Sequence, residues 1–178
     1  HHTAAHHYLS QHFGEAFPEI DVSLPSTVNQ PGQCTAYYST AMLTGYSRSN
    51  EVCENTAFDT VIYHEYGHFA DDMAGGIENA ALSEGWGDLL GTYMSNQPVL
   101  GENLYGEGSY VRDVSSGYRY PYDQFDEQHL LGLSWAGFAW DLRRSLGKEL
   151  AERSVLPVLL ANSIDIPSAV WDTLLIND

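Results

Sequence analysis

Basic residues are scarce in this chain of 178 residues: 7 lysines and arginines stand against 24 aspartates and glutamates, for a formal net charge of −17. Such a charge repels the phosphates of nucleic acids and anionic membrane surfaces, which argues against both as partners. No apolar run reaches 18 residues, so the sequence contains no candidate for a membrane-spanning helix. The composition favours a soluble, secreted protein, and we expect a monomer.

Cysteine is also rare, with Cys34 and Cys53 as the two examples. Only one pairing exists, and bridging them would close a loop of about 20 residues and stabilise the fold by about 3 kcal/mol. Secretion favours the disulfide. The alternative is a pair of buried free thiols.

The rest of the composition indicates one globular domain, with or without a small lobe. Hydrophobic residues make up 43% of the chain and aromatic residues 12%, which is typical of a folded protein with a core. No signal sequence follows His1, so we expect a mature or trimmed chain.

The segment from Thr60 to Gly76 contains His64, Glu65 and His68 in the pattern His-Glu-x-x-His. On a helix, residues i and i+4 lie on one face, so both histidines can direct a ring nitrogen at one point. Glu65 lies about 100° round the helix, where it can reach a water on a metal ion without being a ligand. The spacing predicts a zinc site; for the motif alone, a chance pair of surface histidines is the alternative.

Glu84 and Asp88 follow in the sequence Ala-Leu-Ser-Glu-Gly-Trp-Gly-Asp. With these residues the chain resembles the gluzincin metallopeptidases, in particular the thermolysin and fungalysin families. There a second helix supplies a glutamate as third zinc ligand, and an aspartate four residues later steadies the first histidine. The resemblance implies zinc held by His64, His68 and Glu84 with water in the fourth position, and Asp88 as hydrogen-bond acceptor for His64.

His129, Gly132 and Trp135 form a His-x-x-Gly-x-x-Trp pattern that is similar to one in fungalysin-like enzymes. The family uses this histidine to donate a hydrogen bond to the developing oxyanion; a capping or core histidine is the alternative. The resemblance also implies Glu65 as the general base, which takes a proton from water and delivers it to the leaving amine. The family's oxyanion tyrosine falls near Gly75, where there is none, and the candidates to replace it are Tyr105, Tyr110, Tyr118, Tyr120 and Tyr122.

Two further segments resemble substrate-binding parts of thermolysin-like enzymes. Ala36, Tyr37 and Tyr38 match an Asn-Ala-aromatic-aromatic edge strand that pairs with the substrate backbone, although Thr35 replaces the asparagine. An ordinary half-buried strand is the alternative. Arg112 stands where the family has an arginine that binds a substrate carbonyl; a structural ion pair with a carboxylate is the alternative.

The resemblance implies an α+β, zincin-like fold, with a small mixed sheet, an edge strand over an active-site helix, and a mostly helical C-terminal lobe. We expect a catalytic lobe over 1–126 and the helical lobe over 127–178, where the family usually continues, so a C-terminal portion is expected to be missing. Periodicity and breakers predict helices at about 3–17, 56–74, 78–95, 129–146, 149–163 and 167–176, strands at 20–24, 35–38 and 41–46, and a loop over 25–32.

Three details complete these expectations. Asn55 or Thr56 is expected to cap the active-site helix. The histidine-rich first helix allows a second metal site or, alternatively, packed and solvated histidines. The two last helices are expected to pack through Leu156, Leu159, Leu160, Ile164, Val170, Trp171, Leu174 and Leu175.

The sequence therefore predicts a secreted zinc metallopeptidase, an endopeptidase that hydrolyses protein or peptide substrates. One alternative is a catalytically inactive or truncated zinc-binding module that binds a partner, against which the intact Glu65 weighs. Another is a zinc aminopeptidase, for which no exopeptidase motif stands out. The family's double-calcium site is not predicted, because Thr60 and Ser95 stand in place of two ligands, although the many carboxylates leave calcium open elsewhere.

Overall fold

The computed structural model describes residues 1–121 and 127–178. Its elements in chain order are α1 (His2–Phe13), η1 (Gly14–Ala16), η2 (Pro18–Ile20), β1 (Ser26–Gln30), β2 (Ala36–Ser39), β3 (Leu43–Ser47), α2 (Asp59–Met73), α3 (Ala80–Ser95), β4 (Val99–Leu100), β5 (Arg112–Asp113), η3 (Val114–Ser116), α4 (Gln128–Leu146), α5 (Lys148–Val155), η4 (Leu156–Ala161) and α6 (Ile166–Ile176).

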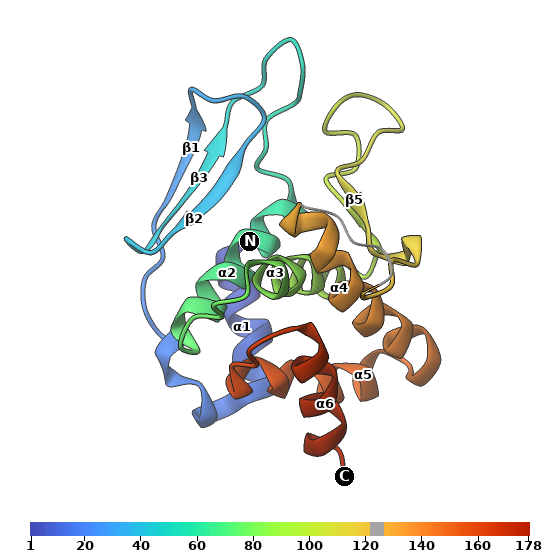
Figure 1. Ribbon diagram of the computed structural model, residues 1–178. Coiled ribbons are helices and arrows are strands. Elements are labelled where there is room, and N and C mark those ends of the chain that lie inside the picture. Colours follow the sequence, from blue (N-terminus) through green and yellow to red (C-terminus); the bar gives the residue numbers. More distant parts are fainter. Residues whose placement is uncertain (122–126) are drawn as a thin grey trace.

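The strands form a three-stranded sheet of order β1-β3-β2 and a two-stranded ladder of β4 and β5. In the larger sheet β1 runs parallel to β3 and β2 runs antiparallel to it. Strand β2 is therefore an edge strand, as expected, and it lies nearest to α2 (Figure 1). Its free side carries unpaired backbone groups that can accept another strand.

Helices α2, α3 and α4 form the centre of the molecule, with α5 and α6 below them in Figure 1. The helices approach closely at glycines. A Cβ on Gly67 of α2 would lie 2.8 Å from the Cα of Gly87 on α3, and a Cβ on Gly132 of α4 would lie 2.7 Å from the carbonyl oxygen of Ala81. Trp86 and Trp135 fill the α3–α4 interface beside these contacts, and both are buried. This packing brings three separate segments to one site.

The predicted fold class is confirmed: a small mixed sheet precedes a mostly helical remainder. The predicted disulfide is also confirmed, since Cys34 and Cys53 are bonded with their Cα atoms 5.8 Å apart. It joins the chain before β2 to the segment that leads into α2.

Among the described residues, no helix is long and apolar enough to cross a membrane. The division into lobes at residue 126 stays a prediction, and this boundary lies at the edge of residues 122–126, outside the described ranges.

The predicted strand at 20–24 is wrong, and so is the loop at 25–32. Pro18 begins a 3₁₀ turn closed by the bond from the Asp21 amide to the Pro18 carbonyl, while Val22 is exposed. The alternation there reflects one buried residue, Ile20, rather than a strand face. Strand β1 forms instead from the polar residues that follow, because backbone pairing to β3 does not need apolar side chains at an exposed edge.

The predicted cap of the active-site helix is also wrong. Helix α2 begins after Phe58, with no side-chain cap. The hydroxyl of Thr56 bonds the backbone of Thr35 and Ser47, and the side chain of Asn55 bonds the amide of Ala57. Both residues hold the segment before the helix against the sheet, which leaves neither free to cap it.

Much of the predicted packing face of the last helices is wrong. Ile164 is 78% exposed and Trp171 is 65% exposed. Leu160, Leu174 and Leu175 are exposed as well, although Leu156 and Leu159 are buried. Helix α6 buries Ile166, Ala169 and Thr173 instead. Periodicity identified the helix, but apolar residues occur on more than one side of it, so the pattern did not define which side packs.

The histidine-rich helix α1 contributes to a buried polar cluster through His12. Its Nε2 lies 3.3 Å from Oε2 of Glu152 on α5, whose other oxygen accepts a bond from Arg143 of α4 at 2.9 Å. Arg143 also donates to the Asn96 side chain at the end of α3. The cluster therefore connects four helices. The metal-site alternative for α1 has no support among the described residues, where the metal-competent group lies elsewhere.

Replacing His12 with glutamine is expected to destabilise the protein more at pH 5.5 than at pH 8.5. The hydrogen bond to Glu152 raises the pKa of His12 against burial and the charge of Lys148. The stabilisation by protonated His12 is therefore complete below its ordinary pKa of about 6.5 and is lost as pH rises through the folded value. We expect a loss of about 1–2 kcal/mol at the lower pH. Urea unfolding at both pH values measures it, with exposed His7→Gln as the control; equal losses at both pH values would contradict the assignment.

Candidate active site

Two histidines on α2 direct their ring nitrogens at one point, because four residues make one helical turn. The Nε2 atoms of His64 and His68 lie 3.1 Å apart. His64 is buried and His68 is partly buried. If both rings carry their proton on Nδ1, the two Nε2 atoms present lone pairs to each other, and a cation between them would remove this repulsion.

Glu84 of α3 completes this group. Its Oε2 lies 3.3 Å from Nε2 of His64 and 3.7 Å from Nε2 of His68, yet this buried oxygen has no hydrogen-bond partner. Four ligands around zinc at bond lengths of about 2.0–2.1 Å stand about 3.3 Å apart. The separations of 3.1, 3.3 and 3.7 Å match that requirement. The three residues can therefore hold a metal ion, and their nitrogen and carboxylate atoms suit zinc.

His64 is held by Asp88, one turn after Glu84 on α3. The Nδ1 atom of His64 donates to Oδ1 of Asp88 at 2.8 Å, and Asp88 is fully buried. Arg112 of β5 binds the same carboxylate through two nitrogens, at 2.7 and 2.8 Å. Burial would raise the pKa of Asp88, but Arg112 and His64 hold it below its usual value. Burial would lower the pKa of His64, but Asp88 and Glu84 raise it to about 9.

His68 has a different support. Its Nδ1 lies 3.2 Å from Oγ of Ser83, and this hydroxyl donates to Oδ2 of Asp71 at 2.6 Å. Asp71 also accepts a bond from the backbone amide of Ile77. Burial raises the pKa of Asp71, while the bonds from Ser83 and Ile77 oppose that shift.

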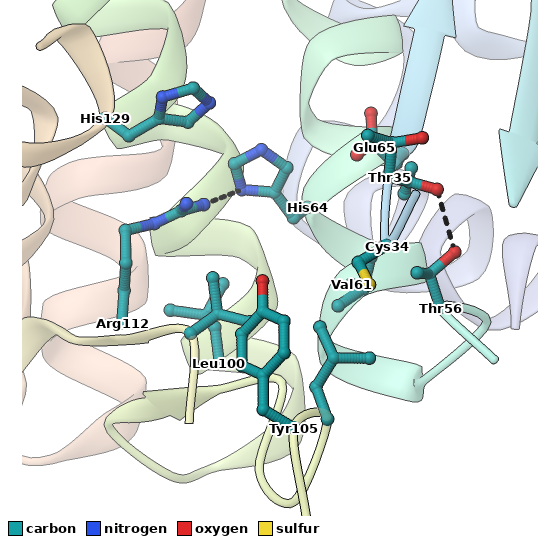
Figure 2. Close-up of a pocket in the computed structure, with 13 residues that line it drawn as sticks. Cys34, Thr35, Thr56, Val61, His64, Glu65, Leu100, Tyr105, Arg112 and His129 are labelled. Carbon is teal, nitrogen blue, oxygen red and sulfur yellow. Dashed lines mark hydrogen bonds between the residues drawn. The ribbon is translucent and has the colours of Figure 1, made fainter. Parts of the chain in front are cut away.

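Of the metal-competent group, His64 lines a cavity of about 260 Å³, together with Glu65, Arg112 and His129. Figure 2 shows Glu65 and Thr35 on one side of His64, with Arg112 and His129 on the other. Apolar side chains also line the cavity: Val61 of α2 and three residues between α3 and β5, namely Leu100, Leu104 and Val111. The cavity thus combines one histidine of the metal-competent group, the buried carboxylate of Glu65 and several apolar side chains, which is typical of a binding site.

His129 lies at the start of α4 and lines the same cavity. Its Nε2 is 3.3 Å from Oε2 of Glu84, and its Nδ1 bonds the carboxylate of Glu127. Glu127 also caps α4 by accepting from the amides of His129 and Leu130. Burial would raise the pKa of Glu127, but these bonds lower it. The cap of the helix is therefore Glu127, and His129 is available to the cavity.

The residues predicted to bind substrate are placed differently from one another. Ala36 lines the cavity, whereas the ring of Tyr37 lies across Gly45 of β3. Arg112 lines the cavity but forms the ion pair that the alternative interpretation expected. Tyr105 is the one candidate oxyanion tyrosine among the described cavity-lining residues, and Tyr122 lies outside the described ranges. The substrate contacts of all these residues stay predictions.

Three site residues were not predicted: Asp71, Ser83 and Glu127. Each has a feature in the sequence whose meaning is clear only once the structure is known. Asp71 stands one turn after His68 on the same helix, and Ser83 directly precedes Glu84. Glu127 is an acidic residue just before a helix, which is a capping pattern. None of these patterns predicts which residue the side chain will bond, because the partner is set by how the helices and strands pack together.

No family model matches the chain, and no curated protein matches it. Among solved structures, the chain is similar to the precursor of protealysin, a metalloproteinase from Serratia proteamaculans, with a TM-score of 0.76. The match covers 97% of this chain and 68% of that chain at 14% sequence identity. The chain has a metalloproteinase-like fold. At 14% identity the similarity shows the fold alone. Within this fold, the group of His64, His68 and Glu84 can bind a metal.

Proposed function

We propose that this chain is a secreted, zinc-dependent metallopeptidase that hydrolyses protein or peptide substrates as an endopeptidase. The observation that carries the proposal is the convergence of His64, His68 and Glu84 at zinc-like separations, beside a cavity that His64 and Glu65 line. Three protein ligands leave a fourth position open, which is the pattern of catalytic rather than structural zinc. The metalloproteinase-like fold supports the same assignment.

His64, His68 and Glu84 would hold the zinc, which when bound would supply a Lewis acid and make the attacking water more acidic. Glu65 is buried beside the ligands and acts as the general base. It accepts the proton of the attacking water while the water oxygen bonds to the scissile carbonyl carbon. Glu65 then returns this proton to the amine nitrogen as the C–N bond breaks.

His129 donates a hydrogen bond to the developing oxyanion. The carboxylate of Glu127 bonds Nδ1 of His129 and orients the ring, so that Nε2 is directed at the metal-competent group. In the doubly protonated ring, Nε2 donates to the oxyanion while Nδ1 donates to Glu127. Donors placed before the reaction stabilise the oxyanion without reorganisation. The neighbouring free edge of β2 adds the substrate as a further strand through backbone hydrogen bonds.

The test is cleavage of a long fluorogenic peptide that is blocked at both ends. We expect the protein to cleave it, to lose activity on treatment with a chelator, and to regain activity when zinc is added. Chelator-resistant cleavage would exclude the metal from the reaction. Zinc binding without cleavage would favour an inactive binding module, and cleavage restricted to peptides with a free N-terminus would favour an aminopeptidase.

A further inference from the structure

The two ligand histidines are held by different devices. His64 bonds the carboxylate of Asp88 directly at 2.8 Å. His68 instead meets the hydroxyl of Ser83 at 3.2 Å, and this hydroxyl meets the carboxylate of Asp71 at 2.6 Å. A serine therefore stands between the second histidine and its carboxylate.

His68, Ser83 and Asp71 form a hydrogen-bonded relay, and the proton positions in it follow from the number of donors. Ionised Asp71 has no proton to give, so the single hydroxyl proton of Ser83 points to Asp71. The Ser83 oxygen can then only accept from His68, which requires the imidazole proton on Nδ1. A neutral ring with its proton on Nδ1 leaves the lone pair of Nε2 free, and Nε2 is the atom that faces His64 and Glu84.

Asp71 is fixed independently of Ser83. Its Oδ1 accepts from the amide of Ile77 at 2.7 Å, and its backbone carbonyl accepts from the amide of Gly76 in the turn after α2. Asp71 is 4% exposed, so solvent does not compete strongly for Oδ2. Ser83 lies on α3 directly before the ligand Glu84. The relay thus connects the two ligand-bearing helices beside the metal-competent group.

We propose that Asp71 and Ser83 are positioning residues for the metal ligand His68, which they hold in the ring orientation and tautomer that present Nε2 to the metal. The proposal rests on the metal site of the proposed function, and it adds a hydroxyl-bridged support that differs from the direct carboxylate support of His64. Supporting groups of metal ligands contribute about 10–100-fold to metal affinity.

Asp71→Asn tests the direction of the relay. The amide oxygen can still accept from Ile77, which places the NH₂ group against Ser83. Because NH₂ cannot accept the hydroxyl proton, Ser83 must donate to His68 instead, and this favours the tautomer with the proton on Nε2. We expect the zinc dissociation constant to rise about 10–100-fold. Competition with a fluorescent chelator in the absence of any peptide measures this constant.

A double-mutant cycle tests whether Asp71 acts through Ser83. Ser83→Ala is expected to weaken zinc binding to a similar degree, and adding Asp71→Asn to it is expected to cause no further loss. Additive losses would overturn the proposal. Ser83→Thr keeps the hydroxyl and is expected to retain most of the zinc affinity.

Asp72→Asn is the matched control. Asp72 lies on the same helix and accepts a bond from the hydroxyl of Tyr38, outside the relay. We expect it to leave zinc affinity unchanged. The unfolding temperature of each metal-free variant separates folding defects from metal binding; a lower temperature with unchanged zinc affinity would assign the relay a purely structural role and overturn the proposal. Absence of zinc binding by the wild-type chain would overturn the proposed function as well, whereas binding by the wild type and equally by Asp71→Asn would overturn only the relay.

Discussion

Replacing Glu65 with glutamine is expected to lower kcat/KM for peptide cleavage about 10²–10⁴-fold while zinc remains bound. Glutamine has nearly the same shape and fits the buried position beside the ligands, so α2 should stay intact. Its amide cannot accept the proton of the attacking water, which removes the base and leaves the three metal ligands in place. Steady-state cleavage of the end-blocked peptide and chelator competition measure the two quantities separately.

The control for this prediction is Glu78→Gln, which makes the same chemical change at an exposed position between α2 and α3. We expect wild-type activity and zinc affinity from it. Cleavage by the Glu65 variant at the wild-type rate would refute the role of Glu65 as base. Loss of zinc together with activity would show instead that Glu65 is needed to build the site.

The half of the site that lies on α2 could be predicted from local geometry alone. Helical spacing places His64 and His68 on one face and Glu65 beside them, whatever the rest of the chain does. The position of Glu84 could not be obtained in this way, because it depends on how closely α3 approaches α2. That approach requires Gly67 and Gly87, which carry no side chains between the helices. The role of Glu84 was predicted from the resemblance to a known family, since residue spacing along the chain could not predict it.

The three-stranded sheet was predictable only where its strands contain aromatic and apolar residues. Strands β2 and β3 contain aromatic and apolar residues and were placed within a few residues of their observed bounds. Strand β1 is polar and exposed, so it has no burial signal, and its pairing with β3 is made by the backbone. A short alternation just before it, at 20–24, produced a false strand instead.

Pairings between distant charged residues were the least predictable part of the site. The sequence left two roles open for Arg112, binding of a substrate carbonyl and an ion pair with a carboxylate. The observed ion pair depends on a short ladder in which Leu100 of β4 pairs with Arg112 of β5. That ladder brings the guanidinium to Asp88, a residue on another element. With 24 acidic residues in the chain, the sequence offers Arg112 many partners and no means of selecting one.

Replacing Asp88 with asparagine is expected to weaken zinc binding about 10–100-fold and to destabilise the fold by about 3–5 kcal/mol. Both carboxylate oxygens accept bonds, Oδ1 from His64 and Arg112 and Oδ2 from Arg112. An amide has one acceptor oxygen, so one of these donors would face an NH₂ group. The loss corresponds to a fall of roughly 6–20 °C in unfolding temperature for a chain of this size. Calorimetry of the metal-free protein and chelator competition measure the two effects.

Two comparisons separate the buried charge pair from a general effect of removing a carboxylate. Asp141→Asn breaks an exposed ion pair, in which the side chain of Asp141 is 71% exposed and that of Arg144 is 65% exposed. This change should lower the free energy of unfolding by less than about 1 kcal/mol. Adding Arg112→Gln to Asp88→Asn removes the unpaired buried charge, so the double variant should be more stable than Asp88→Asn alone. Its zinc affinity should remain low, because His64 still lacks its carboxylate. Recovery of both stability and zinc affinity would mean that Asp88 acts only through Arg112 and does not orient His64.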